Sequence, residues 1–113
     1  MAGFVAGDVV VVPFPFTDLR SLKRRPALVL AAFTRGDVLL CQITSQAGTH
    51  PDAIAIERES FQPDGALSRL SFVLPHRLVT AHGSLVLRRV GALTADAFGR
   101  IVNQVCDTIR RGG

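Results

Sequence analysis

Four cationic residues, Arg20, Lys23, Arg24 and Arg25, lie within six positions of the chain, just before Pro26. An arginine guanidinium is always charged and can pair bidentately with phosphate oxygens. Pro26 restricts the residue before it to an extended backbone, so Arg25 is the member with the best-defined direction. The run predicts a phosphate-binding segment, although a solvated basic loop would have the same composition.

Hydroxyl and amide side chains follow an apolar stretch in the segment Gln42-Ile43-Thr44-Ser45-Gln46. A strand end holds polar side chains on a rigid base, which suits a site. Thr44 and Ser45 could donate hydrogen bonds to a phosphate. Ordinary capping of a strand end accounts for the same residues, and the segment by itself leaves both interpretations open.

Histidine is the third candidate for chemistry, because it can take and give protons near neutral pH. The chain has His50, His76 and His82, and the turn residues around them place all three in predicted loops. Two histidines could cut RNA by moving a proton from the 2′-hydroxyl to the leaving 5′-oxygen. Surface histidines without a role are the alternative, and His76, between Pro75 and Arg77, is the one to test.

Motifs of other chemistries are missing from the sequence. Its Cys and His residues do not have zinc spacing, and neither a phosphate-binding glycine loop nor a nucleophile elbow occurs. The acidic residues stand singly, so a carboxylate cluster for magnesium is not indicated. We therefore expect no metal and no cofactor.

Length and composition indicate the number of domains and the kind of partner. A length of 113 residues fits a single domain, 1–113. The net charge of +4 and a pI of about 10.5 favour an anionic partner such as a nucleic acid or an acidic protein. Hydrophobic residues make up 48% and the mean hydropathy is +0.32, more than so small a domain can bury. The excess predicts a homodimer.

The apolar runs of the sequence bear on where the protein is located in the cell. No run approaches the roughly 20 residues of a membrane span, and the first 16 residues have no basic n-region of a signal peptide. Cys41 and Cys106 do not make a disulfide framework, and each sits in an apolar run that predicts a buried thiol. We expect a cytoplasmic protein without membrane contact.

The elements that must position these residues are short strands followed by one helix. Phe98, Ile101, Val102, Val105, Cys106 and Ile109 form one helical face, with Thr94 as N-cap, Asp96 at the positive end of the dipole and Gly112 as stop. The pattern predicts a mainly β fold, a small barrel or strongly bent sheet with a C-terminal helix. Strands are predicted at residues 9–12, 26–33, 38–44, 53–57, 70–74 and 84–90. They are separated by a basic loop at 14–25, a turn at 34–37, loops at 45–52 and 58–67, and a linker at 75–83 in which 77–81 could be extended or helical.

The order of motifs resembles one known family. Gly7-Asp8-Val9-Val10, Pro13-Phe14-Pro15-Phe16-Thr17-Asp18 and Arg25-Pro26-Ala27-Leu28-Val29-Leu30 are similar to the opening of PemK/MazF-type toxins. Gln42-Ile43-Thr44-Ser45 falls where that family has its strand-end threonine. Residues 78–80 and 85–93 resemble its later strands and helix entry. The resemblance covers nearly the whole chain. The segment 18–24 is shorter and more basic than the corresponding loop of many members, and Leu74 stands where a basic residue is expected.

The resemblance implies an SH3-like barrel with a terminal helix, a homodimer, and a sequence-specific endoribonuclease that is the toxin of a type II toxin–antitoxin pair. Its arginine before proline maps onto Arg25 and its catalytic threonine onto Thr44. We expect the RNA contacts to come from the polar and basic residues around the two: Thr17, Asp18, Arg20, Lys23, Arg24, Ser45, Gln46, His76 and Arg77. The expected partners are single-stranded RNA and a cognate antitoxin protein.

Two functions of other classes fit the same sequence. A non-catalytic SH3-like barrel could bind nucleic acid or an acidic protein through its basic loop. A toxin of this fold could instead poison a protein target such as a topoisomerase, an idea that rests on fold analogy alone.

Overall fold

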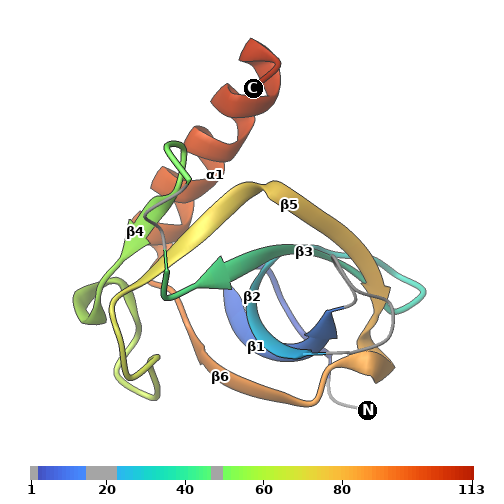
Figure 1. Cartoon of the computed structure of the whole chain (residues 1–113). Helices are drawn as coiled ribbons and strands as arrows, with labels where there is room; N and C mark the ends of the chain where they lie inside the picture. Colours follow the sequence, from blue (N-terminus) through green and yellow to red (C-terminus); the bar gives the residue numbers. More distant parts are fainter. Residues whose placement is uncertain (1–2, 15–22, 47–49) are drawn as a thin grey trace.

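A computed structural model describes residues 3–14, 23–46 and 50–113 of the chain. In the described part, six antiparallel strands form one strongly curled sheet in the order β4-β5-β3-β2-β1-β6 (Figure 1). The predicted mainly β fold with a C-terminal helix is confirmed. The strands are β1 (Asp8–Phe14), β2 (Lys23–Ala32), β3 (Asp37–Thr44), β4 (Ile54–Ile56), β5 (Ser71–His82) and β6 (Arg88–Ala92).

The helix α1 (Ala95–Arg111) begins and ends at the predicted residues. The Thr94 hydroxyl accepts a hydrogen bond from the Ala97 N–H at 3.2 Å, and Gly112 adopts the left-handed conformation with φ 79°. Figure 1 shows α1 packed beside β4 and projecting beyond the sheet. Ile109, predicted on the apolar face, lies on this projecting end and is 59% exposed. No helix within the described ranges is long and apolar enough to cross a bilayer.

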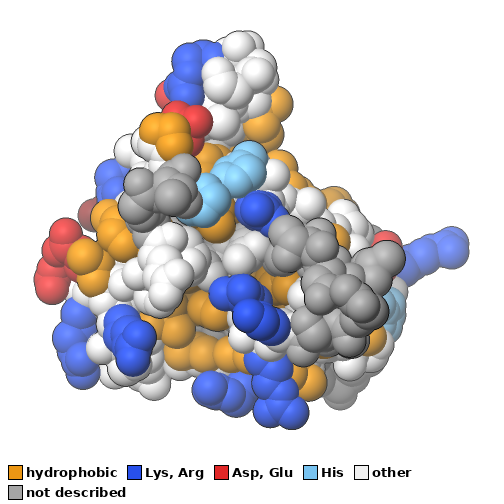
Figure 2. Space-filling model, in the orientation of Figure 1, with side chains coloured by type: hydrophobic (Ala, Val, Ile, Leu, Met, Phe, Trp, Pro, Cys, Tyr) orange, Lys and Arg blue, Asp and Glu red, His pale blue; other side chains and the backbone are white. Residues whose placement is uncertain are grey.

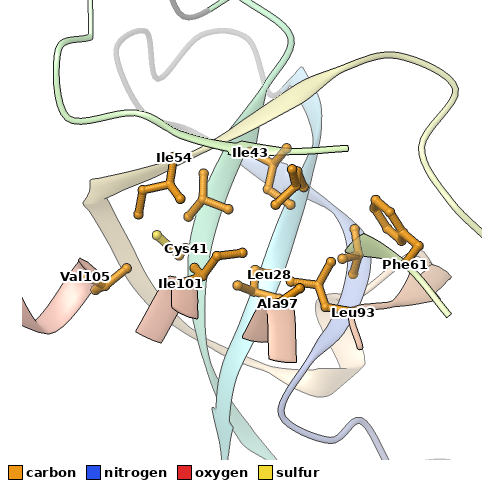
Figure 3. Packing of buried hydrophobic residues seen from close by; sticks show 12 residues of the cluster. Leu28, Cys41, Ile43, Ile54, Phe61, Leu93, Ala97, Ile101 and Val105 are labelled. Atoms are coloured by element: carbon orange, nitrogen blue, oxygen red, sulfur yellow. The ribbon is translucent and has the colours of Figure 1, made fainter. Parts of the chain in front are cut away.

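Two apolar clusters lie on opposite faces of the same strands, because successive side chains of a strand point to opposite sides. One cluster joins the sheet to α1, and Figure 3 shows Leu28, Cys41 and Ile43 facing Ala97 and Ile101. The other cluster contains the alternate residues, among them Val10, Val12, Ala27, Val29 and Leu40. Cys41 is fully buried as predicted, whereas Cys106 is half-buried.

The basic loop predicted at residues 14–25 ends earlier than expected. β2 begins at Lys23, and its first residues pair with β1 as Phe14 with Lys23, Pro13 with Arg24 and Val12 with Arg25. Consecutive charges are typical of loops, and for this reason the sequence predicts no strand at residues 23–25. An antiparallel partner supplies ladder hydrogen bonds whatever the side chains are, so tertiary pairing overrides that composition.

The linker predicted at residues 75–83 is wrong. β5 runs without a break from Ser71 to His82, so the predicted strand at 70–74 extends, and His76 and His82 lie in a strand instead of loops. A short 3-10 turn, η2 (Gly83–Leu85), separates β5 from β6, which starts at Arg88 and not at residue 84. Pro75 does not end the strand because it lies in the irregularity between the pairs Ile43–Val73 and Cys41–Leu78, where no regular ladder bond is lost.

Candidate active site

Arg25 and Thr44, the residues that the resemblance implies are catalytic, come from neighbouring strand ends. β2 and β3 are antiparallel, with Ala27 paired to Gln42. This is the last pair of the β2–β3 ladder, and two residues beyond it on each strand, Arg25 and Thr44 are the positions that the same register would set opposite each other. Both are half-buried. The long, paired strands therefore hold a cation and a hydroxyl side by side on a rigid base.

A cleft of about 380 Å³ opens at these strand ends. Six of the residues predicted from the sequence line it: Lys23, Arg24, Arg25, Thr44, Ser45 and Gln46. Thr17, Asp18 and Arg20, which were also predicted, lie outside the described residues. His76 and Arg77 are not among the described residues that line the cleft. The structure thus brings the basic run and the strand-end hydroxyls together in one place.

The charge of the cleft is positive. Its described lining includes no Asp or Glu, and the Lys23 and Arg24 side chains are exposed beside the half-buried Arg25. The Thr44 hydroxyl oxygen accepts a hydrogen bond from the Gln46 N–H at 3.1 Å, which leaves its hydrogen available to a ligand. Within residues 3–14, 23–46 and 50–113, no group of three or more His, Cys, Asp or Glu side chains could hold a metal ion.

Sequence reasoning missed the opposite wall of the cleft, which the loop before β5 supplies with Ser68, Arg69 and Ser71. Arg69 is exposed, and its carbonyl oxygen accepts a hydrogen bond from the Ser71 hydroxyl at 3.0 Å. Arg69 is a single cation among turn residues, so nothing in its local sequence marks it. The stretch 66–71 contains two serines and an arginine but no carboxylate, and this is the one signal that the sequence contains.

The loop that carries Arg69 is anchored to β6. Gln62 donates hydrogen bonds through its backbone N–H to the Ala92 carbonyl at 2.8 Å and through its side-chain amide to the Leu93 carbonyl at 3.2 Å. Arg89 bridges the buried Asp8 and the exposed Asp64 at 3.1 and 3.0 Å. These two hydrogen-bonded carboxylates raise the pKa of Arg89. The bridge therefore ties the turn of this loop to β1 and β6.

His76 and Arg77 form a separate group on β5. The His76 and His50 rings lie 5.3 Å apart, and the Arg77 Nε–H is directed at the His76 Nε2 at 3.4 Å. Desolvation lowers the pKa of His76, with further lowering by the charges of Arg77 and His50, while Asp52 opposes the shift. The lowered pKa favours the neutral form of His76, and an exposed neutral ring can accept a proton.

Comparison with solved structures supports the fold. MazF from Deinococcus radiodurans matches with a TM-score of 0.71 at 21% identity, covering 96% of this chain and 98% of that one. The Mycobacterium tuberculosis toxin MazF-mt6 matches with a TM-score of 0.70 at 15% identity, over 91% and 96% of the two chains. An endoribonuclease in complex with its cognate antitoxin, from a mycobacterial species, matches with 0.68 at 16% identity, over 96% and 95%.

A search of curated proteins gave no match. The family model of PemK-like, MazF-like toxins of type II toxin–antitoxin systems matches residues 6–109. This range includes all the strands, the cleft and most of α1. The resemblance inferred from the sequence motifs is confirmed, and the chain belongs to the PemK-like, MazF-like toxins of type II toxin–antitoxin systems.

Proposed function

We propose that this toxin is a sequence-specific endoribonuclease that cuts single-stranded RNA, including mRNA, in the cleft between β2 and β3. The observation that carries the proposal is that Arg25 and Thr44 line one cleft, which Lys23, Arg24 and Arg69 make cationic. A polyanion is the substrate class that such a cleft attracts. A structural neighbour is itself described as an endoribonuclease, which agrees with this assignment.

RNA carries its own nucleophile, so the protein has few tasks in the reaction. The 2′-oxygen attacks the adjacent phosphorus and forms a P–O2′ bond while the P–O5′ bond breaks. The 2′ proton passes to a base, and the leaving 5′-oxygen takes up a proton. The products are a 2′,3′-cyclic phosphate and a free 5′-hydroxyl. Arg25 stabilises the extra charge on the phosphate, and Thr44 donates a hydrogen bond to it.

The cut requires no divalent metal in this proposal, because the guanidinium of Arg25 takes the electrostatic role and the nucleophile comes from the substrate. Arg25 itself is a poor base, since a guanidinium has a pKa above about 12. We further propose that the toxin is a cytoplasmic homodimer and that an acidic cognate antitoxin blocks the cleft. The structural neighbours include complexes described as MazE-MazF, which supports an antitoxin partner.

The deciding experiment incubates the purified protein with single-stranded RNA in EDTA and identifies the product ends. We expect cleavage in the chelator, with cyclic phosphate and 5′-hydroxyl ends. Activity that disappears in EDTA and returns with magnesium would contradict the mechanism. Tight RNA binding without cleavage would favour the binding module, and inhibition of a topoisomerase without any action on RNA would favour the protein poison.

A further inference from the structure

A second groove continues from the cleft across the sheet. This groove, called the β6 groove below, is lined by apolar residues that include Val11, Pro26, Leu67 and Leu87 and by the two cations Arg24 and Arg88. Its volume is about 610 Å³, within the range of roughly 300 to 1,000 Å³ that holds small ligands. Arg24, Pro26 and Leu67 also line the cleft, so the two hollows are continuous.

The strand register explains why the β6 groove is a fixed feature. Val11 of β1 is paired with Pro26 of β2 on one side and with Arg88 of β6 on the other. The three residues are cross-strand neighbours and share one face of the sheet. The Leu87 N–H also donates a hydrogen bond to the Val11 carbonyl at 2.8 Å. The path from β3 to β6 crosses three strand spacings, which is about 14 Å and long enough for more than one nucleotide.

The lining of the β6 groove combines apolar and cationic side chains. Leu87 is 50% exposed although it is a large aliphatic side chain. Within the described residues, Arg24 and Arg88 have no carboxylate partner, whereas the next residue, Arg89, bridges two carboxylates. The described lining of the groove contains no Asp or Glu. Figure 2 shows this face, where Lys and Arg side chains surround exposed apolar ones over β6 and the loop before β5.

We propose that the β6 groove is a second RNA subsite, which holds nucleotides next to the cleavage point. The apolar side chains of the groove support the flat faces of the bases, and Arg24 and Arg88 contact the phosphates. This inference rests on the proposed function for its choice of single-stranded RNA. It assigns roles to Leu87 and Arg88, which the catalytic cleft does not use. An extended substrate thereby gains affinity that a minimal substrate cannot have.

The test measures binding of a labelled oligouridylate of about 12 nucleotides over a range of salt concentrations. Arg88→Ala should weaken binding about fivefold at low salt and reduce the slope of log K against log salt by about 0.7, as expected for one lost phosphate contact on a single strand. Leu87→Ser should weaken binding without changing that slope. Arg58→Ala, which removes an exposed cation from the 3-10 turn η1 (Arg58–Ser60), is the matched control and should change neither quantity.

The inference is overturned if Arg88→Ala and Leu87→Ser bind RNA like Arg58→Ala. It is equally overturned if these two variants bind RNA normally and lose affinity for the antitoxin instead, because the groove is then a protein-binding surface. Cleavage by the wild-type chain with no effect of Arg88→Ala leaves the proposed function standing and removes the subsite. If Arg88→Ala weakens RNA binding but the wild-type chain cleaves no RNA, the subsite stands and the proposed function is removed.

Discussion

Arg24 and Arg25 are adjacent in the chain, yet their side chains meet different surroundings. Arg25 lies opposite the buried Val12 and is half-buried itself, whereas Arg24 is exposed and lines both the cleft and the β6 groove. The alternation of a strand causes this difference, because neighbours point to opposite faces. The chemical consequence is that Arg25 lies half-buried in the cleft with Thr44, while Arg24 is an exposed counter-charge.

Replacement of Arg25 by alanine should therefore abolish cleavage, with kcat/KM lower by about 100- to 1000-fold, the usual cost of one preorganised charge-stabilising donor. Lys23→Ala and Arg24→Ala should mainly raise KM, and their effects should fade at high salt. Steady-state kinetics on a short RNA at two ionic strengths measures kcat and KM for the three variants. Similar, modest losses in all three variants would mean that Arg25 is one phosphate contact among several.

The two cysteines differ in burial and should differ in reactivity. Cys41 is fully buried between β3 and α1, its thiol donates to the Leu74 carbonyl at 3.0 Å, and burial raises its pKa to about 12. It stays a protonated thiol at pH 8, and the thiolate is the form that reacts. We expect a thiol reagent to modify Cys106 in the native protein and to leave Cys41 intact until the chain unfolds. Rapid labelling of the native Cys106→Ser variant would contradict this.

At the scale of elements, the loop before β5 depends on a close approach of two glycines. A Cβ on Gly91 would collide with the Gly65 carbonyl, and a Cβ on Gly65 with the Val90 carbonyl. Backbone cannot move aside as a flexible side chain can. This contact, with the Gln62 hydrogen bonds and the Arg89 bridge, fixes the loop that brings Ser68 and Arg69 to the cleft.

Gly91→Ala should lower the free energy of unfolding by about 2 kcal/mol or more, because the loop must separate from β6. It should also weaken RNA binding, since Arg69 moves with the loop. Gly99→Ala is the control: a Cβ at this exposed position of α1 meets no atom within 4 Å, and alanine in a helix is favoured over glycine by about 1 kcal/mol. Urea unfolding of both variants tests the contrast, and equal destabilisation by the two would refute it.

At the scale of the whole molecule, the sheet has an edge that the described residues leave uncovered. β4 pairs with β5 only over residues 71–73, so residues 78–82 of β5 pair on one side only, with β3. Leu78 lies on this stretch and is 38% exposed. An uncovered edge with an apolar side chain can pair with another chain. It is the feature of the structure that best agrees with the homodimer expected from the apolar composition.

We expect a homodimer at micromolar concentration, with a mass of twice 12.1 kDa by light scattering. Leu78→Lys should shift the equilibrium towards monomer, because an edge lysine opposes strand pairing. Val5→Lys, at a residue that is 62% exposed and belongs to none of the strands, should leave the mass unchanged. A wild-type protein that sediments as a monomer under these conditions would remove the dimer from the proposal.

Features that depend on a few neighbouring residues could be predicted without the fold. The helix from Ala95 to Arg111 followed from its apolar period, the Thr94 cap and Gly112. The turn at residues 34–37 followed from Gly36, which has φ 93°. The assignment of Arg25 and Thr44 to one site is what the family resemblance implies, and both residues line the same cleft.

Features that depend on residues far apart in the chain could not be predicted in this way. The passage of β5 through Pro75, the strand identity of Lys23 to Arg25, and the arrival of Arg69 and Arg88 beside the cleft all result from pairing across the sheet. The physical reason is that sheet register sums many weak cross-strand and packing terms between residues far apart in the chain, and local propensity contributes little to that sum. Caps and turns are local interactions, and for that reason they can be predicted from the chain alone.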